Sequence, residues 1–436
     1  MTDAINQRIE QIKNGKVPEG YTYKHHVKPD SWMDKPLDIF FHKVKEKNHD
    51  KKFKTVLTNS AVNGVILQSQ YFEKDIANEE NTDGYYVVKE GDYIYNPRIS
   101  EKAPYGPINQ NSTGCTGIAS PLYTVFSKKE NVHVCNEYIR YYLCSTEWHK
   151  YIYSVANYGV RFDRMNISDN DFMKMPIALP QIKEQQKIAE ILMQCDKIIE
   201  LYEQEIEALK KLKKAYLKKM FPKKGENVPE LRFAGFTDPW KQRKLGEIGR
   251  TYTGLSGKTK DDFGHGQARF VTYMNVFSNP VTNPDMTDPI EIDQNQNEVE
   301  IGDVFFTTSS ETPEEVGMTS VLLEKQGKTY LNSFCFGFRP TEKFDSFYLA
   351  YMLRSQSTRE KITLLAQGIS RYNISKSKVM EIAVSVPTLD EQKCVGEYLR
   401  NLDNLITLHQ RKLEEQQKQK KSLMQLLLTG IVRVKI

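Results

Sequence analysis

The chain has 436 residues, a length that accommodates two or three domains of about 100–200 residues each. Hydrophobic residues make up 39% of it and charged residues 27%, a balance typical of a folded globular protein and not of a disordered one. The net charge of +5 permits a polyanionic partner but does not establish one.

The start of the chain, residues 1–16, is polar throughout and does not fit the apolar core of a secretory signal peptide. No later run approaches the ~18 consecutive apolar residues of a membrane span. The six cysteines are scattered without CxxC spacing, so we expect reduced thiols in a cytoplasmic protein. Ile5, Ile9 and Ile12 share one face of a predicted N-terminal helix, which we expect to pack against the C-terminal end of the chain.

Residues 17–179 form the first predicted globule, which is of the α+β type. Trp32 and Phe40 are candidate anchors of its core. Short β-rich runs punctuated by Gly and Asn lie at 55–58, 64–67, 85–88 and 93–95. Helical spacing returns between Glu137 and Ser154.

Residues 180–222 carry the first of two long predicted helices. Pro180 precedes the helix and Glu184 lies in its first turn, as suits a helix N-terminus. Nine of ten positions at coiled-coil spacing are apolar or near-apolar, which predicts a seam for a second helix. The seam residues that we single out are Ile188, Leu192, Ile199, Tyr202, Ile206 and Leu209. A helix of about 38 residues is roughly 57 Å long.

Residues 223–386 form a second predicted α+β globule. Its β-like runs lie at 268–277 and 303–308, and helical spacing extends from Phe347 to Leu365.

Residues 387–436 carry the second long helix. Its apolar seam residues are Leu399, Leu402, Ile406 and Leu413. Three further seam positions hold polar residues, namely His409, Gln416 and Lys420. Buried polar residues in a coiled coil specify register and partner at a cost in stability. The same pattern would arise if this half of the seam were simply wetter or packed against something else.

The two long helices are copies of one plan, 207 residues apart. The matching pairs are Pro180/Pro387, Glu184/Glu391, Gln185/Gln392, Glu190/Glu397, Leu192/Leu399 and Asp196/Asp403. At the same offset, Arg164–Ser168 corresponds to Arg371–Ser375 just before each helix. This repeat predicts two α+β globules separated by a long antiparallel two-helix coiled coil, with an internal pseudo-twofold repeat.

Catalytic and metal-binding signatures are weak in this sequence. Gly257-Lys258-Thr259 ends like a phosphate-binding loop, but Tyr252 stands where that loop needs a glycine. The glycine spacing at 263–266 does not fit an S-adenosylmethionine loop. A loose nuclease-like set of Asp and Lys residues is of a kind that arises often by chance, and no histidine has metal-ligand spacing. We therefore predict a binding protein without catalytic residues, cofactor or metal of its own.

Double-stranded DNA is the partner that best suits two globules on a repeated frame, because half-sites about 34 Å apart lie on one face of the duplex. Polar and basic residues of the predicted loops are candidate contacts to phosphates and bases. In the first globule these candidates are Arg98, Lys102, Tyr105, Asn109, Arg161 and Arg164. In the second globule they are Lys258, Lys260, Arg269, Tyr273, Ser309, Ser310 and Arg371. Arg164 and Arg371 occupy the same position in the two halves. A position common to both suits a phosphate contact or a salt bridge to the helices better than base readout.

The chain resembles the specificity subunit of type I restriction-modification systems over essentially its whole length. The strongest marks are the two Pro-x-[Ile/Leu]-x-Glu-Gln segments, at 180–185 and 387–392, each opening a long helix. The run at 228–248 is similar to the family's usual approach to its second target-recognition domain, whereas the corresponding run at 28–41 is irregular.

The resemblance implies two target-recognition domains that each read one half of a bipartite, asymmetric DNA site. It also implies helical regions that set the spacing and dock two methyltransferase subunits, with restriction subunits in the full complex. S-adenosylmethionine, ATP and Mg would belong to those partner subunits, and the chain itself would catalyse nothing. The alternatives are a coiled-coil adaptor whose globules bind proteins, and a self-contained methyltransferase or nuclease, against which the missing motifs argue.

Overall fold

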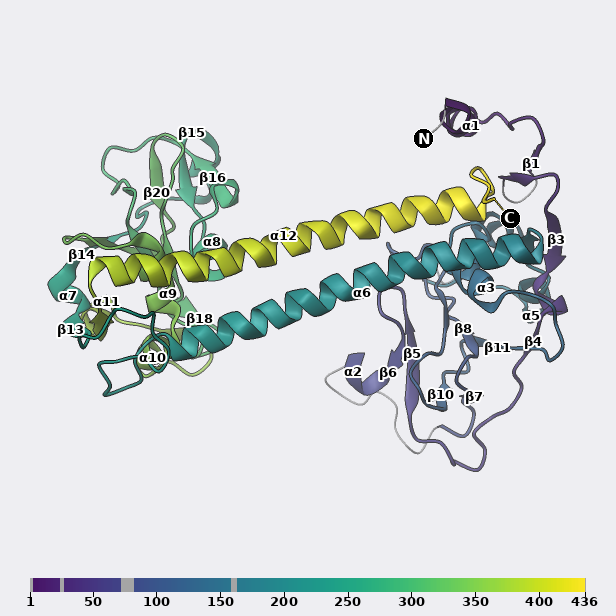
Figure 1. Ribbon diagram of the computed structural model, residues 1–436, viewed down its shortest axis with the longest axis horizontal. Helices are drawn as coiled ribbons and strands as arrows, with labels where there is room; N and C mark the ends of the chain where they lie inside the picture. The colour runs from purple at the N-terminus through teal and green to yellow at the C-terminus, as the bar shows by residue number, and fades with distance from the viewer. Residues whose placement is uncertain (1–2, 24–26, 72–81, 158–162, 436) are drawn as a thin grey trace. The chain divides into compact units, whose positions relative to one another are not determined.

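The computed structural model describes residues 3–23, 27–71, 82–157 and 163–435 (Figure 1). The chain divides into two compact units, residues 1–201 with 413–436 and residues 202–412. The division falls inside both long helices, so each helix contributes to both units. The predicted domain boundaries at residues 16, 179, 222 and 386 follow the sequence repeat instead, and they stay a prediction.

The first unit begins with short elements and then forms its sheets and helices (Figure 1). Its elements are α1 (Asp3–Lys13), β1 (Tyr21–Tyr23), β2 (Val27–Pro29), β3 (Met33–Pro36), η1 (Leu37–Ile39), β4 (Phe41–Lys43), β5 (Val56–Ser60), β6 (Gly64–Leu67), α2 (Gln68–Tyr71), β7 (Tyr86–Val88), β8 (Tyr93–Tyr95), β9 (Ile108–Gln110), β10 (Gly117–Ala119), β11 (Thr124–Lys128), α3 (Asn136–Leu143), α4 (His149–Val155), α5 (Asp169–Met173) and β12 (Pro176–Leu179). The predicted helical stretch from Glu137 to Ser154 is thus two helices, α3 and α4.

Two four-stranded sheets of the first unit have the strand orders β6-β5-β10-β7 and β4-β11-β8-β9. Side chains alternate between the two faces of a strand. Ile94 therefore joins a buried cluster with residues of the other sheet, whereas Tyr93 and Tyr95 join a cluster with α3, α4 and α5. Trp32, predicted as an anchor, is 2% exposed in this second cluster.

The second unit repeats this plan with longer strands (Figure 1). Its elements are β13 (Lys241–Lys244), α7 (Leu245–Ile248), β14 (Gly249–Thr253), η3 (Lys260–Asp262), β15 (Phe263–Val271), α8 (Tyr273–Ser278), η4 (Pro284–Met286), β16 (Thr287–Ile290), β17 (Val304–Thr307), β18 (Ser309–Ser310), β19 (Thr319–Val321), β20 (Thr329–Leu331), β21 (Cys335–Pro340), α9 (Ser346–Arg354), α10 (Gln356–Thr363), β22 (Tyr372–Asn373), α11 (Lys376–Met380) and β23 (Ala383–Val386). The main sheets have the orders β14-β21-β17-β19 and β16-β15-β20.

The prediction of one β run at 268–277 is wrong in its second half. Strand β15 ends at Val271, and the next residue caps α8, because the Thr272 hydroxyl accepts a hydrogen bond from the Asn275 amide at 3.2 Å. The predicted helix at 347–365 likewise divides at Ser355 into α9 and α10.

The two long helices are α6 (Ile182–Lys219), teal in Figure 1, and α12 (Leu389–Leu428), yellow. Within each unit their segments run antiparallel. In the first unit Asp196 pairs with Lys420, and in the second Lys213 pairs with Asp403 at 2.5 Å. These two ion pairs are the same pair seen twice, because both members recur at an offset of 207 residues. The internal repeat and the antiparallel pairing are therefore confirmed.

The seam residues singled out from the sequence all lie on covered faces of their helices. Ile188, Leu192 and Leu399 are fully buried, and Leu402, Ile406 and Ile206 are 6–8% exposed. The other four are partly buried, namely Ile199, Tyr202, Leu209 and Leu413.

Each long helix opens with a buried Glu-Gln pair, and the glutamate and the glutamine make different contacts. Glu184 accepts two hydrogen bonds from Arg433, at 2.5 and 2.7 Å, and Glu391 accepts two from Arg232, at 2.7 and 2.8 Å. In both units the arginine follows the C-terminal end of the antiparallel neighbour helix, so a bidentate ion pair closes each helix pair.

The glutamine fastens the helix start to its own globule. The side chain of Gln185 donates to the Pro180 carbonyl and accepts from the Cys135 amide at 3.0 Å. Gln392 repeats both contacts, with the Pro387 carbonyl and the Asp345 amide. The motif that carried the family resemblance is therefore the joint between each globule and its helix.

The three polar seam residues are partly buried and differ in their partners. Lys420 pairs with Asp196, and His409 lies 2.9 Å from the Glu205 carboxylate. We expect only Gln416→Leu to raise stability, by up to ~1 kcal/mol of apolar burial, since no charged partner is lost. Lys420→Leu should lower it, because Asp196 would lose the nearer of its two cations and keep only Arg140, at 3.7 Å. Urea unfolding of the two variants beside the parent chain checks this, and a gain for Lys420→Leu would contradict it.

Helix α1 contacts the C-terminal segment, as expected. Arg8 donates a hydrogen bond to the Ile431 carbonyl at 3.1 Å, and the Tyr21 hydroxyl donates to the Gly430 carbonyl at 2.8 Å. A Cβ atom on Gly430 would lie 2.6 Å from Pro29 side-chain atoms, so the glycine permits this close approach. The first and last segments of the chain are thereby joined within the first unit.

Two titratable groups at the turn between α3 and α4 give stability an unusual pH profile. Burial raises the pKa of Glu147 from 4.5 to about 7 and lowers the pKa of His149 from 6.5 to about 4. Between pH 4.5 and 6.5 Glu147 is protonated in the folded chain and ionised in the unfolded chain. Over the same range His149 is neutral in the folded chain and protonated in the unfolded chain. The Glu147 contribution therefore weakens the fold as pH rises, whereas the His149 contribution weakens it as pH falls.

We therefore expect the two contributions to oppose each other over this range in the parent chain. Glu147→Gln should leave a fold that loses stability as the pH falls from 6.5, and His149→Phe should leave one that loses stability as the pH rises from 4.5. Urea unfolding between pH 4.5 and 7.5 measures both slopes. Slopes unchanged from the parent in either variant would contradict the assignment.

Candidate nucleic-acid interface

A cavity of about 540 Å³ in the second unit gathers four of the predicted contact residues. Tyr273, Ser309, Ser310 and Arg371 come from α8, β18 and the segment before β22. The remaining lining residues are Met274, Phe277, Glu311, Glu315 and Ser370. Sequence segments about 100 residues apart thus meet at one place.

Hydrogen bonds order this cavity. The Tyr273 hydroxyl donates to the Ser309 carbonyl at 2.7 Å, and the Arg371 guanidinium donates to the Ser309 hydroxyl at 3.1 Å. The same guanidinium lies 5.7 Å from the centre of the Phe334 ring. Strand β18 pairs with β22, which brings Arg371 to the rim of the cavity, where the residue is exposed. Arg371 is therefore positioned and still accessible.

The first unit has a cavity of about 380 Å³ that contains Arg98 and Lys102, both exposed. Its other lining residues are Thr58, Asn59, Ser60, Ala61, Val62, Asn96, Ile99, Ser100, Glu101, Pro107 and Tyr123. The amide of Asn96 donates to the Asn59 carbonyl at 3.0 Å, so this wall is ordered by its own hydrogen bonds. The main chain of Arg98 forms a β-bridge with Arg164.

The two cavities occupy corresponding places in the repeated plan. Each lies just beyond a strand that follows a Gly-Asp turn, in which Asp92 or Asp303 accepts a hydrogen bond from an amide three residues earlier at 2.8 Å. In each unit the segment after this strand pairs with the Arg-x-Asn-Ile-Ser segment. The two cavities thus share the same surrounding turn, strand and Arg-x-Asn-Ile-Ser segment, whereas their lining residues differ.

Three predicted contact residues make contacts within the chain, and their DNA contacts stay predictions. The Asn109 amide donates to Asn59 and to the Ser60 carbonyl. Arg269 donates to the hydroxyl and the carbonyl of Thr287. The Tyr105 ring packs 4.8 Å from the His149 ring. Sequence alone did not separate these residues from exposed ones, because their partners are distant in the chain.

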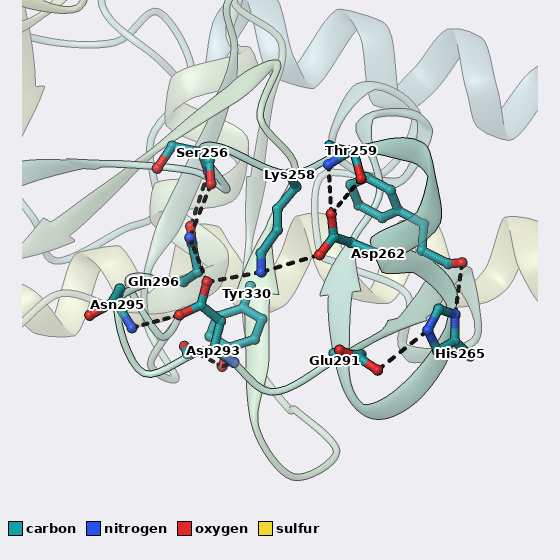
Figure 2. Close-up of polar contacts among 11 residues, drawn as sticks. Ser256, Lys258, Thr259, Asp262, His265, Glu291, Asp293, Asn295, Gln296 and Tyr330 are labelled. Atoms are coloured by element: carbon teal, nitrogen blue, oxygen red, sulfur yellow. Dashed lines mark hydrogen bonds and ion pairs between the residues drawn. The ribbon is translucent and has the colours of Figure 1, made fainter.

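Lys258 belongs to a polar cluster shown in Figure 2. Its ammonium lies 2.9 Å from Asp293 and 3.7 Å from Asp262, and its side chain is 14% exposed. The ammonium holds the pKa of Asp293 far below its usual range. Lys258 therefore ties the 258–262 segment to the 293–296 turn. Lys260 is exposed and remains a candidate.

Arg161 lies outside the described residues. Arg164 is partly buried, 3.5 Å from the Asp163 carboxylate, so the two corresponding arginines differ in exposure. DNA contacts by Arg98, Lys102, Lys260, Tyr273, Ser309, Ser310 and Arg371 stay predictions.

Sequence reasoning missed the acidic and apolar members of the second cavity. Glu315 accepts a hydrogen bond from the Thr312 hydroxyl at 3.0 Å, and Glu311 is exposed beside it. Basic and small polar residues are the usual DNA contacts, and a carboxylate in a loop has no sequence signature of its own. The position of Glu311 directly after the buried strand β18 was a signal that could have found it.

Comparison with known families agrees with this repeated architecture. The family model described as the type I restriction modification DNA specificity domain matches residues 29–211 and 237–417, well over half of the chain. The chain belongs to this family. It contains two copies of the domain, which confirms the family that the sequence resembles.

The MjaVIII specificity subunit of a type I restriction enzyme from Methanocaldococcus jannaschii is 27% identical over 299 residues. That match covers 61% of this chain and 64% of the relative, so the chain spans less than two thirds of the relative's length.

Two solved structures are similar to this chain, and the first agrees with it in fold. A chain from a structure described as the basis of complex assembly and conformational transition of the type I R-M system has a TM-score of 0.58 at 16% identity. It covers 94% of this chain and 100% of that one. The HsdS subunit from Thermoanaerobacter tengcongensis has a TM-score of 0.48 at 17% identity, covering 94% and 99% of the two chains. At 16% identity the first of these likenesses concerns the fold alone.

Among the described residues, no group of three or more His, Cys, Asp and Glu is arranged to hold a metal ion. In the same part of the chain, no helix has the length and apolar character needed to cross a membrane.

Proposed function

We propose that this chain is the DNA sequence-specificity subunit of a type I restriction-modification complex, and that each unit reads one half of a bipartite, asymmetric site. The observation that carries the proposal is the pair of corresponding cavities, which share a frame but differ in lining. A shared frame suits two readers of one duplex, and different linings suit two different half-sites.

The chemistry of the two cavities supports base readout by different patterns. Glu311 and Glu315 in the second unit can accept hydrogen bonds from base edges that offer amino groups, such as cytosine N4 or adenine N6, and Arg371 at the rim suits a phosphate. Arg98 and Lys102 in the first unit suit phosphates or the acceptor edge of guanine.

The exposed faces of the long helices support docking of two copies of one partner, the methyltransferase subunit. Ile198 and Leu201 on α6 are 42% and 50% exposed, and Leu405 and Leu408 on α12 are 43% and 46% exposed. The two pairs are again 207 residues apart. A partner that recognises one apolar pair has the same pair available on the other helix.

Catalysis belongs to partner subunits in this proposal. S-adenosylmethionine would serve the methyltransferase subunits, and ATP and Mg the restriction subunits, within the cytoplasm. The adaptor alternative, in which the globules bind proteins, makes the opposite prediction for DNA.

Methylome sequencing of cells that express the chain with its methyltransferase subunit tests the proposal. We expect methylated adenines in a two-part motif, and none with the chain alone. The purified complex should bind that motif with an affinity that falls steeply as salt is raised, because phosphate contacts release counterions. Absence of salt-sensitive DNA binding would favour the adaptor.

A further inference from the structure

Two partly buried arginines stand behind the cavity of the second unit. Arg354, the last residue of α9, donates to the Thr319 carbonyl at 2.7 Å. It also donates to three carbonyls around the end of α8, those of Val276, Phe277 and Asn279, at 2.9–3.0 Å. Carbonyls at a helix C-terminus lack intrahelical partners and favour a cation. Arg354 therefore holds the end of the helix that supplies Tyr273 and Phe277 to the cavity.

Arg359, in α10, holds the opposite wall. It donates to the Gly317 carbonyl at 2.6 Å, the Glu314 carbonyl at 2.8 Å and the Val316 carbonyl at 2.5 Å. A Cβ atom on Gly317 would lie 2.7 Å from Ile362, so the loop is pressed against α10. The same loop supplies Glu311 and Glu315 to the cavity.

Every hydrogen bond that these two guanidinium groups make within the described part of the chain goes to a backbone carbonyl. Burial lowers the pKa of both to about 10, so both stay charged near neutral pH. A guanidinium is planar and presents five N–H donors in a fixed arrangement. Its planar fork fixes several loop carbonyls at once.

In the described part of the first unit, no arginine stands at the position that corresponds to Arg354. Tyr138 and Tyr141 on α3 correspond to Tyr348 and Tyr351 on α9, which aligns Cys144 with Arg354. The first-unit half of the DNA site is therefore an internal control for the second.

Resting on the proposed function, we infer that Arg354 and Arg359 are positioning residues for specificity. They hold α8 and the 311–318 loop at the separation that lets the cavity discriminate bases in the half-site of the second unit. Neither residue lines the cavity itself. Their effect reaches DNA through the loops that they fix.

The test uses the full chain in complex with its methyltransferase subunit. The parent motif is read first by methylome sequencing. Binding of Arg354→Met and Arg359→Met complexes is then measured on duplexes with single base changes in each half-site. We expect discrimination in one half to fall by about tenfold or more, the scale of one lost base contact, and discrimination in the other half to stay unchanged.

Leu245→Ala and Ile248→Val serve as matched controls, since both residues are fully buried in the core of the second unit and lie apart from the cavity. They should lower the melting temperature while keeping discrimination. Arg354→Lys, which keeps the charge but not the fork, replaces the Met variant if that variant fails to fold.

Retained discrimination in the arginine variants would overturn the inference, and so would equal loss in the core controls. A parent complex without a two-part motif would instead overturn the proposed function, and this inference with it. The two failures are thereby distinguishable.

Discussion

Replacing residues 226–386 with the corresponding segment of another specificity subunit is expected to change one half of the methylated motif completely and leave the other half intact. The physical reason is that the cavity of the second unit is built wholly from residues inside this segment. Strands β13 and β23 lie near the start and at the end of this segment and pair with each other, so the segment closes on itself. Methylome sequencing of cells with the chimera and its methyltransferase subunit provides the readout.

The structure adds design rules for this chimera. Arg232 bonds Glu391, Tyr348 donates to the Ser385 carbonyl, and Tyr351 donates to Asp403 at 2.7 Å. Arg232 and Tyr351 reach across the junction to α12, so the donor segment must retain an arginine and a tyrosine at these places. A chimera in which Arg232 is absent provides the matched control and should assemble poorly. A change in both halves of the motif, or in neither, would rule out two independent readers.

Arg232→Met is expected to destabilise the second unit by about 3–5 kcal/mol, the usual cost of removing one partner from a buried ion pair. Glu391 is 1% exposed and Arg232 13%, so the remaining carboxylate would be left without its cation away from water. Urea unfolding of the full chain, followed by circular dichroism, measures the loss.

A double variant, Arg232→Met with Glu391→Gln, should recover part of the stability, because the orphaned charge is then gone. Arg433→Met provides a comparison in the first unit. The Arg433 side chain is 41% exposed, so water can replace more of its interaction with Glu184 and a smaller loss is expected. Equal losses in the two units, or no recovery in the double variant, would mean that burial is not the cause.

Long, strongly periodic segments were predictable because their evidence is local. The bounds of α6 and α12 differ from the predicted helices by only a few residues, and the apolar positions of their seams are covered. Short elements were less predictable. Val271 and Tyr273 belong to a strand and a helix that meet at a single capping residue, and periodicity over so few positions does not distinguish them.

Candidate contacts were harder to predict than helices, because exposure and partners are properties of the folded chain. Arg371 and Arg269 look alike in the sequence, yet the first lies at a cavity rim and the second is hydrogen-bonded to Thr287. Tyr273 and Ser309 were selected for their side-chain chemistry, and the fold brings them together.

The sequence alone determined the 207-residue repeat, the paired helices and the family. A fixed offset and a heptad pattern are properties of the order of residues and do not depend on the folded structure. The ion pairs of Glu184 and Glu391 are not, because their arginines lie 249 and 159 residues away. The two cavities likewise depend on loops folding back over the sheets. Contacts between distant segments are set by packing and chain closure, which no local pattern encodes.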